Sequence, residues 1–226
     1  MNKQEFEGYL LNNFSKVADP DFLPCVKKLY NNCFVDIPSL LKKLELVKKN
    51  IKEIENAKDL IVEFKAAQEF LGIPVLNHIY FGENPDLHLE IGPIKLAIEV
   101  KRFRYREKDT MDQEILSTSI EKGHLAEYGD PARVQEQIES VLIKKAIKYS
   151  GTEQFFLYLW SNSPHQVENV EILCASRNVF SKMKLSNLIG IFFKTNSNNR
   201  NLILSSQVST DNSVVNCFKD WFREFR

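Results

Sequence analysis

The chain has 226 residues, of which 43% are hydrophobic and 27% charged, and its 30 basic and 30 acidic residues leave no formal net charge. This composition is that of an ordinary globular protein, and it argues against a disordered polyelectrolyte or a uniformly basic coat protein for nucleic acid. The sequence has no signal-peptide pattern and no apolar run that could span a bilayer, so we expect a cytoplasmic protein.

The cysteines and histidines give no sign of a zinc site. Cys25, Cys33, Cys174 and Cys217 lack the Cys-x-x-Cys spacing, and the four histidines are scattered along the chain. Three of the cysteines have apolar neighbours, which predicts buried free thiols in a reducing compartment.

Residues 1–56 are predicted to be helical. Within them, Pro38-Ser39 opens a helix with an apolar stripe on one side and lysines on the other. The stripe consists of Leu40, Leu41, Leu44, Val47, Ile51 and Ile54, and the lysines are Lys42, Lys43, Lys48, Lys49 and Lys52. We interpret the lysine face as solvated surface, with contact to a phosphate backbone as the alternative.

The next helix is predicted from Asn56 to Leu71, where Gly72 and Pro74 stop it. A strand from Val75 to Phe81 follows and leads into a hairpin. Asp86–Ile91 and Ile94–Lys101 alternate apolar and polar residues around a turn at Gly92-Pro93. In the second strand, Glu99 and Lys101 share a face, and burying such residues is costly unless they are paired or bind something.

Beyond the hairpin, residues 102–130 show no periodicity and are expected to form a long loop that begins with Arg102, Arg104 and Arg106. Asp130-Pro131 then caps a helix that runs to Tyr149 and carries Lys144 and Lys145. Further predicted elements are a fully buried strand from Thr152 to Trp160, a helix from Pro164 to Lys184, two strands (Leu188–Lys194 and Asn201–Val208) that form a hairpin, and a terminal helix.

Pro85-Asp86 followed twelve residues later by Glu99-Val100-Lys101 resembles the signature of the PD-(D/E)XK nuclease superfamily. Pro20-Asp21 and Glu63-Phe64-Lys65 match parts of the signature too, but both lie in helical context. The order helix, three strands, helix, strand from Asn56 to Trp160 is also that of the superfamily core. The resemblance therefore implies an α/β fold with a restriction-endonuclease-like core, a mixed central sheet flanked by helices.

The resemblance also implies the chemistry. Asp86, Glu99 and the Val100 carbonyl would bind Mg²⁺, for which Mn²⁺ can substitute, and Lys101 would orient the attacking water and offset phosphate charge. An additional acid from the preceding helix would be Glu63, with Glu69 fitting less well. A glutamine from the following helix would be Gln137, with Gln135 second.

The expected function is thus a Mg²⁺-dependent endonuclease acting on DNA, such as a restriction or other defence enzyme. Its expected DNA contacts are Arg102, Arg104, Arg106, Lys144 and Lys145. The alternative is a non-catalytic nucleic-acid- or protein-binding module on the same fold, in which Glu99 and Lys101 form a salt-bridge face.

The expected organisation is an N-terminal helical extension (1–56), a nuclease core (57–210) and a C-terminal helix (211–226) in one compact unit. The sequence does not decide between DNA and RNA as the substrate, or between a monomer and a homodimer.

Overall fold

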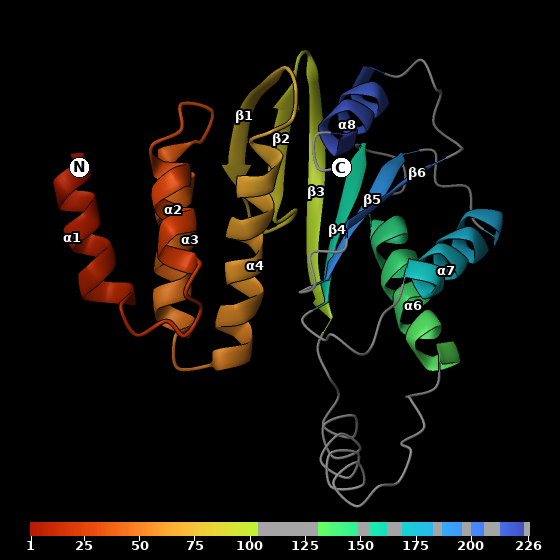
Figure 1. The fold of residues 1–226 in the computed structure, drawn as a ribbon, viewed down its shortest axis with the longest axis horizontal. Helices are drawn as coiled ribbons and strands as arrows, with labels where there is room; N and C mark the ends of the chain where they lie inside the picture. The colour runs from red at the N-terminus through yellow and green to blue at the C-terminus, as the bar shows by residue number, and fades with distance from the viewer. Residues whose placement is uncertain are drawn as a thin grey trace, which may run out of the picture.

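The computed structural model describes residues 1–103, 131–148, 154–161, 169–182, 187–195, 200–205 and 213–223. The chain has an α/β fold, and its described strands form one six-stranded sheet in the order β1-β2-β3-β4-β5-β6 (Figure 1). The strands are β1 Leu76–Phe81, β2 Leu87–Ile91, β3 Ile94–Phe103, β4 Phe155–Ser161, β5 Leu188–Thr195 and β6 Arg200–Leu204.

The sheet is mixed. β1, β2 and β3 pair antiparallel, β3, β4 and β5 pair parallel, and β6 returns antiparallel to β5. The predicted α/β class, with a mixed sheet flanked by helices, is confirmed.

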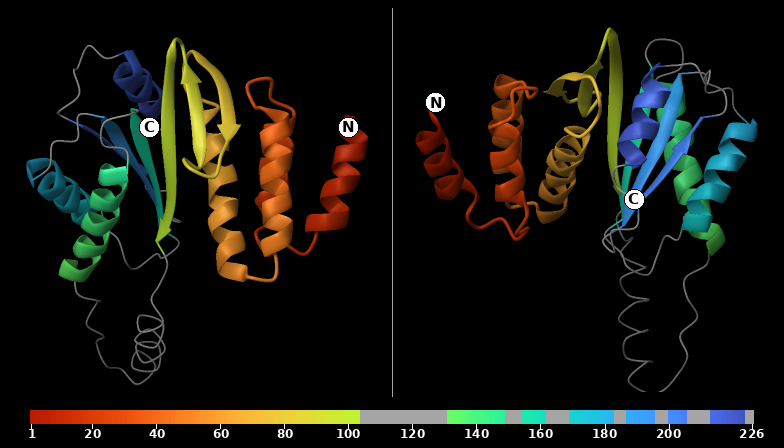
Figure 2. Two further views of the ribbon diagram at one scale, coloured as in Figure 1. Left: turned by 180° about the vertical axis from the view of Figure 1, so that it is seen from behind. Right: turned by 45° about the horizontal axis from the view of Figure 1, so that its top comes forward.

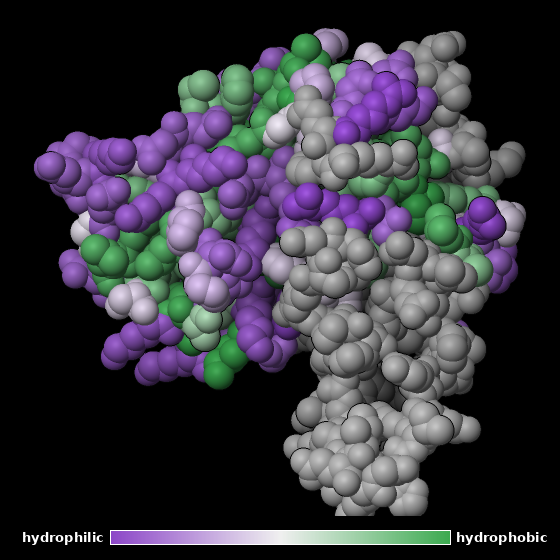
Figure 3. All heavy atoms as spheres, viewed as in Figure 1, coloured by the Kyte–Doolittle hydropathy of each residue, from purple (hydrophilic) through white to green (hydrophobic). Residues whose placement is uncertain are grey.

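Helices cover both faces of the sheet (Figures 1 and 2). One face carries α4 Ile54–Phe70 and α8 Ser213–Arg223, with α1 Lys3–Phe14, α2 Phe22–Tyr30 and α3 Ile37–Asn50 packed beyond α4. The other face carries α6 Pro131–Lys148 and α7 Asn169–Lys182. Because both faces are covered, every residue of β4 is buried, as the apolar run there predicts. The side chains over α4 on the face seen in Figure 3 are mainly hydrophilic.

The N-terminal helices share the core of the sheet. Aromatic rings pack in series from α1 to β1, with centroid separations of 5.8 Å for Phe14–Phe22, 5.5 Å for Phe22–Phe64 and 5.0 Å for Phe64–Phe81. Such offset and edge contacts between rings are favourable beyond the area that they bury. The last residue of β1, Phe81, is therefore connected to α1 by continuous packing.

The segment before α3 pairs with the outer edge of β1. Val35 forms a parallel bridge with Ile79, whose amide donates to the Phe34 carbonyl at 2.7 Å and whose carbonyl accepts from the Asp36 amide at 2.9 Å. The Phe81 amide donates to Ser39 Oγ at 3.0 Å. The start of α3 is capped by Asp36, whose side chain accepts from the Ser39 amide. Helix α3 is thus anchored to the strand that leads into the candidate site.

Several boundaries differ from the predicted ones. β1 begins at Leu76 because Val75 has a positive φ of 53°, and α4 begins at Ile54, before the expected domain boundary. β4 begins at Phe155, and β6 covers Arg200–Leu204. The predicted residues 152–153, 164–168, 183–184 and 206–208 lie outside the described part of the chain.

The cysteines correct one expectation. Only Cys25 is buried, because Cys33 and Cys174 lie at exposed helix or turn positions and Cys217 is partly exposed. In the part of the chain that the structure describes, no helix combines the length and the apolar character needed to cross a lipid bilayer.

Candidate active site

The candidate site is built around the loop of residues 82–86, which joins β1 to β2. The loop is tight: the Gly82 amide donates to the Asp86 carbonyl at 2.9 Å, and a Cβ on Gly82 would lie 2.4 Å from the Pro85 carbonyl oxygen. Real Cβ atoms do not approach backbone that closely, so only glycine fits here. The loop fixes the backbone of Asp86 at the start of β2.

Two of the expected acids meet across β2 and β3. Leu87 pairs with Ile98, so Asp86, one position earlier, lies opposite Glu99. Directly opposed residues in an antiparallel pair share a face, with Cβ atoms about 5 Å apart. Asp86 Oδ2 accepts a hydrogen bond from the Val100 amide at 2.8 Å, which holds the carboxylate against β3. Asp86 is partly exposed, whereas Glu99 is only 2% exposed.

The Val100 carbonyl belongs to the same group. A strand residue directs its N–H and C=O toward the same neighbouring strand, and the Val100 N–H points to Asp86. Its carbonyl therefore faces the same side. The residue opposite in the continued register is Pro85, which has no N–H and cannot donate the usual ladder hydrogen bond. The proline of the Pro-Asp pair thus gives no ladder hydrogen bond to the Val100 carbonyl oxygen, which lies beside two carboxylates.

Glu63, on α4, lies close to Asp86. It is 7% exposed, and burial together with the nearby Asp86 charge raises the pKa of Glu63 to about 8. Lys43 forms an ion pair with Glu63 and lowers that pKa, but by less than burial and Asp86 raise it. Glu63 Oε2 is fully buried and, apart from the ion pair, accepts no hydrogen bond. Three acids from α4, β2 and β3 therefore gather around one loop.

Two lysines that the sequence did not assign to the site contact these acids. Lys43 is 4% exposed, which corrects its assignment to the solvated lysine face of α3. Lys148, near the end of α6, forms an ion pair with Glu99 and donates to Asn84 Oδ1 at 2.7 Å. Lys43 falls on the same side of α3 as Leu40, Leu44 and Val47, and this position in the apolar stripe was the available signal.

Other expected site residues lie elsewhere. Lys101 is exposed, not buried beside Glu99 as expected. Arg102 is 5% exposed, and its guanidinium is held by Asp59 and Glu55 of α4, so it does not fit the expected contact with phosphate. Burying it there satisfies its charge.

The remaining expected residues are described less fully. Lys144 is exposed on α6, in keeping with a surface contact. Gln137, Gln135 and Lys145 lie in α6, but their side chains are outside the described part of the structure, as are Arg104 and Arg106 altogether.

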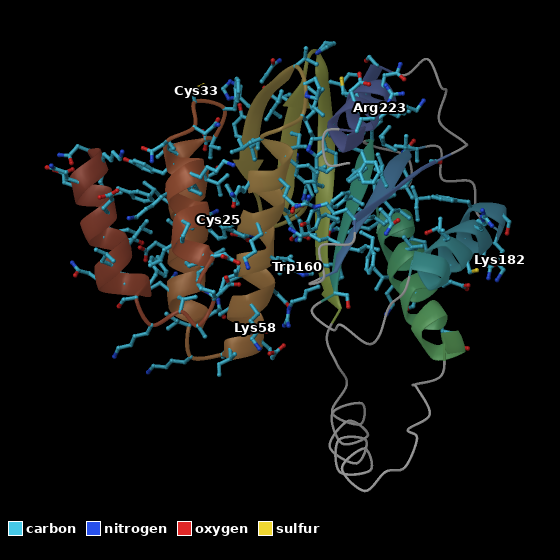
Figure 4. The ribbon with its side chains drawn as sticks, viewed as in Figure 1. Cys25, Cys33, Lys58, Trp160, Lys182 and Arg223 are labelled. Atoms are coloured by element: carbon cyan, nitrogen blue, oxygen red, sulfur yellow. The ribbon has the colours of Figure 1, made fainter. Side chains whose placement is uncertain are left out.

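Glu69, the second choice for the acid on α4, belongs to a separate cluster. Its carboxylate accepts from Tyr158 Oη at 2.9 Å and pairs with Lys194. Lys194 and Lys65 also lie over the ring of Trp160, at 5.6 and 4.8 Å from its centroid. Trp160 itself lies between α4 and the sheet (Figure 4). The preference for Glu63 over Glu69 agrees with this arrangement.

The donor atoms suit a hard cation, since carboxylates and a carbonyl are the ligands that Mg²⁺ and Ca²⁺ prefer. Among the described residues, however, no three histidine, cysteine, aspartate or glutamate side chains converge into a ready-made metal site. Lys43 and Lys148 hold two of the three acids instead. A cation here would bind the acids in exchange for these ammonium groups.

No protein-family model matches the chain, and no curated protein or solved structure matches it either.

Proposed function

We propose that the chain is a Mg²⁺-dependent endonuclease that hydrolyses phosphodiester bonds in DNA, on a restriction-endonuclease-like core. The observation that carries the proposal is the pairing of Asp86 with Glu99 across β2 and β3, beside the Val100 carbonyl. The order α4, β1, β2, β3, α6, β4 supports it, because the PD-(D/E)XK superfamily that the sequence resembles has this order in its core.

In this proposal Asp86, Glu99, the Val100 carbonyl and Glu63 hold the cation. When bound, Mg²⁺ would supply Lewis-acid activation of the phosphate and a water of lowered pKa. The buried Oε2 of Glu63 contacts the Lys43 ammonium, and a cation would take the place of that ammonium at this oxygen.

The lysines around the acids have different tasks. Lys101 is exposed and shares a face of β3 with Glu99, which supports a contact with the substrate phosphate. Lys148, which is exposed, would pass from Glu99 to a phosphate oxygen when the cation binds. Lys144, one turn earlier on α6, extends this cationic surface toward the DNA backbone. A role in restriction or another defence system fits such an enzyme.

A non-catalytic binding module is the second candidate, and one observation favours it. Lys43 and Lys148 already contact the side chains of Glu63 and Glu99, as they would in a site that has no chemistry to perform.

The first test is cleavage of a substrate panel, comprising duplex DNA of long mixed sequence, single-stranded DNA and RNA, with Mg²⁺ or Mn²⁺. We expect duplex cleavage that EDTA abolishes and that Asp86→Asn reduces by at least about 10²-fold through loss of a ligand. Glu90→Gln is the matched control, because this acid lies on β2, the strand that follows Asp86, and pairs with Lys95 away from the site. Cleavage that survives full chelation contradicts the proposal, and calorimetry with no Mn²⁺ binding and no cleavage supports the binding module.

A further inference from the structure

Lys43 stands where the packing of α3 calls for an apolar residue. The buried positions of α3 are Leu40, Lys43, Leu44 and Val47, and the preceding Lys42 is exposed. An ammonium in a core position is costly to desolvate and persists only when well-placed partners hold it.

The contacts of Lys43 join two of the three acids. Its Nζ donates to the Gly82 carbonyl at 2.7 Å and forms an ion pair with Glu63. The Gly82 amide donates to the Asp86 carbonyl, and Asp86 Oδ2 accepts from the Val100 amide. These contacts form a continuous series from α3 through the 82–86 loop to β3, with α4 attached at Glu63.

We propose that Lys43 is a positioning residue: it fixes the 82–86 loop against α4 and so sets Asp86 relative to Glu63. The N-terminal helices are then part of the site and not an appendage to it. The consequence for cleavage rests on the proposed function, whereas the consequence for the loop does not.

Burial separates this role from direct catalysis. At 4% exposure, Lys43 does not reach substrate, unlike the exposed Lys101 and Lys148. Its loss therefore affects the geometry of the acids and leaves the DNA-contacting surface unchanged, so kcat falls while KM is retained.

The test uses Lys43→Met, which keeps the unbranched stem and removes the charge, with Lys42→Met as the matched control. Lys42 is the adjacent lysine, and among the described residues it makes an exposed 3.3 Å contact with Glu83 of the same loop. In the metal-free Lys43→Met protein, we expect the Gly82 and Val100 amides to exchange hydrogen about tenfold faster relative to Leu89 in the centre of β2. Lys42→Met leaves these ratios unchanged. Unchanged ratios in Lys43→Met as well would overturn the proposal.

Since Lys43→Met leaves Glu63 buried without its partner, that variant could unfold. The double variant Lys43→Met/Glu63→Gln removes both charges and keeps the test decisive. We expect it to fold and still to show fast exchange at Gly82 and Val100. Wild-type protection in the double variant would mean that Lys43 only neutralises Glu63, and the positioning role would fail.

Cleavage kinetics give a second test that is independent of the hydrogen-exchange measurement. A fall in kcat of about tenfold or more with KM within about twofold is expected for Lys43→Met. If the wild-type chain cleaves nothing, the proposed function fails, but the exchange measurement still decides whether Lys43 holds the loop.

Discussion

Glu63 combines two conditions that oppose ionisation, because it is buried and Asp86 lies nearby. The unfolded chain ionises this residue near its ordinary value of 4.5, whereas the folded chain retains the proton until about pH 8. Between these values the folded state binds one more proton, so raising the pH lowers the free energy of unfolding by about 1.4 kcal/mol per unit. The loss of stability that comes from ionising Glu63 is absent below pH 4.5 and complete above about pH 8.

We therefore expect that, in the metal-free Glu63→Gln protein, the free energy of unfolding falls less steeply between pH 5 and pH 8 than in the wild type. Its gain over the wild type should grow with pH and reach a few kcal/mol, to order of magnitude, at pH 8. Urea denaturation at several pH values measures this. Glu90→Gln should keep the wild-type slope, and a Glu63→Gln slope equal to that of the wild type would show that Lys43 keeps Glu63 ionised.

The lysines show how a single residue can be misjudged from sequence. Lys43 lies in an apolar stripe of α3, yet its charge and its lysine neighbours predict an exposed side chain. Lys148 reaches Glu99 across 49 residues, a contact that no local spacing predicts. The position of Lys101 on the face of Glu99 could be predicted, but its exposure could not. Long-range packing decides which of several similar side chains is buried.

At the scale of elements, the 82–86 loop and the β2–β3 turn each depend on a glycine for a different reason. Gly82 is confined by the Pro85 carbonyl, whereas Gly92 has a φ of 55° and open space around it. An alanine at Gly82 must displace the loop that holds Asp86. An alanine at Gly92 meets no atom and suffers only backbone strain.

Gly82→Ala and Gly92→Ala should consequently differ in function more than in stability. Each should lower the free energy of unfolding by about 1–3 kcal/mol. Only Gly82→Ala should weaken Mn²⁺ binding in calorimetry, by about tenfold or more, because it moves a ligand. Equal Mn²⁺ affinity in the two variants would argue that Asp86 is not a ligand.

Most elements could be predicted because their signals are local. The alternation in β2 and β3 and the Gly92-Pro93 turn fix the register, and the register alone brings Asp86 opposite Glu99. Apolar periodicity likewise predicts the ends of α4 and α6 closely, whereas the stripe assigned to α3 continues wrongly to Ile54, which begins α4 and is exposed. The side-chain partners of the acids come from α3 and α6, whose approach to the loop depends on tertiary packing.

For the whole molecule, the packing of Phe22 bears on cooperativity. Phe22 is fully buried on α2 and contacts Phe14 and Phe64, so it joins the N-terminal helices to α4. Both tryptophans, Trp160 and Trp221, lie in the same hydrophobic core near α4. A defect at Phe22 should destabilise this core as one unit.

We expect Phe22→Ala to lower the stability by about 3–5 kcal/mol. Its urea transition should move equally when followed by far-ultraviolet circular dichroism and by tryptophan fluorescence. Leu11→Ala, at an exposed position of α1, is the control and should change little. A circular-dichroism transition that precedes the fluorescence transition would instead identify the N-terminal helices as a separately folding domain.

The pairing of residues 34–39 with β1 has a further consequence, for self-association. An outermost strand presents unsatisfied amides and carbonyls, on which strands from other molecules can assemble into aggregates. Here the chain occupies that edge itself at Ile79 and Phe81, with its own backbone and Ser39 Oγ. The segment that precedes α3 thus also covers the edge of β1 and prevents strands of other molecules from pairing with it. A chain that lost this segment would expose an unpaired, aggregation-prone strand edge directly beside its proposed active site.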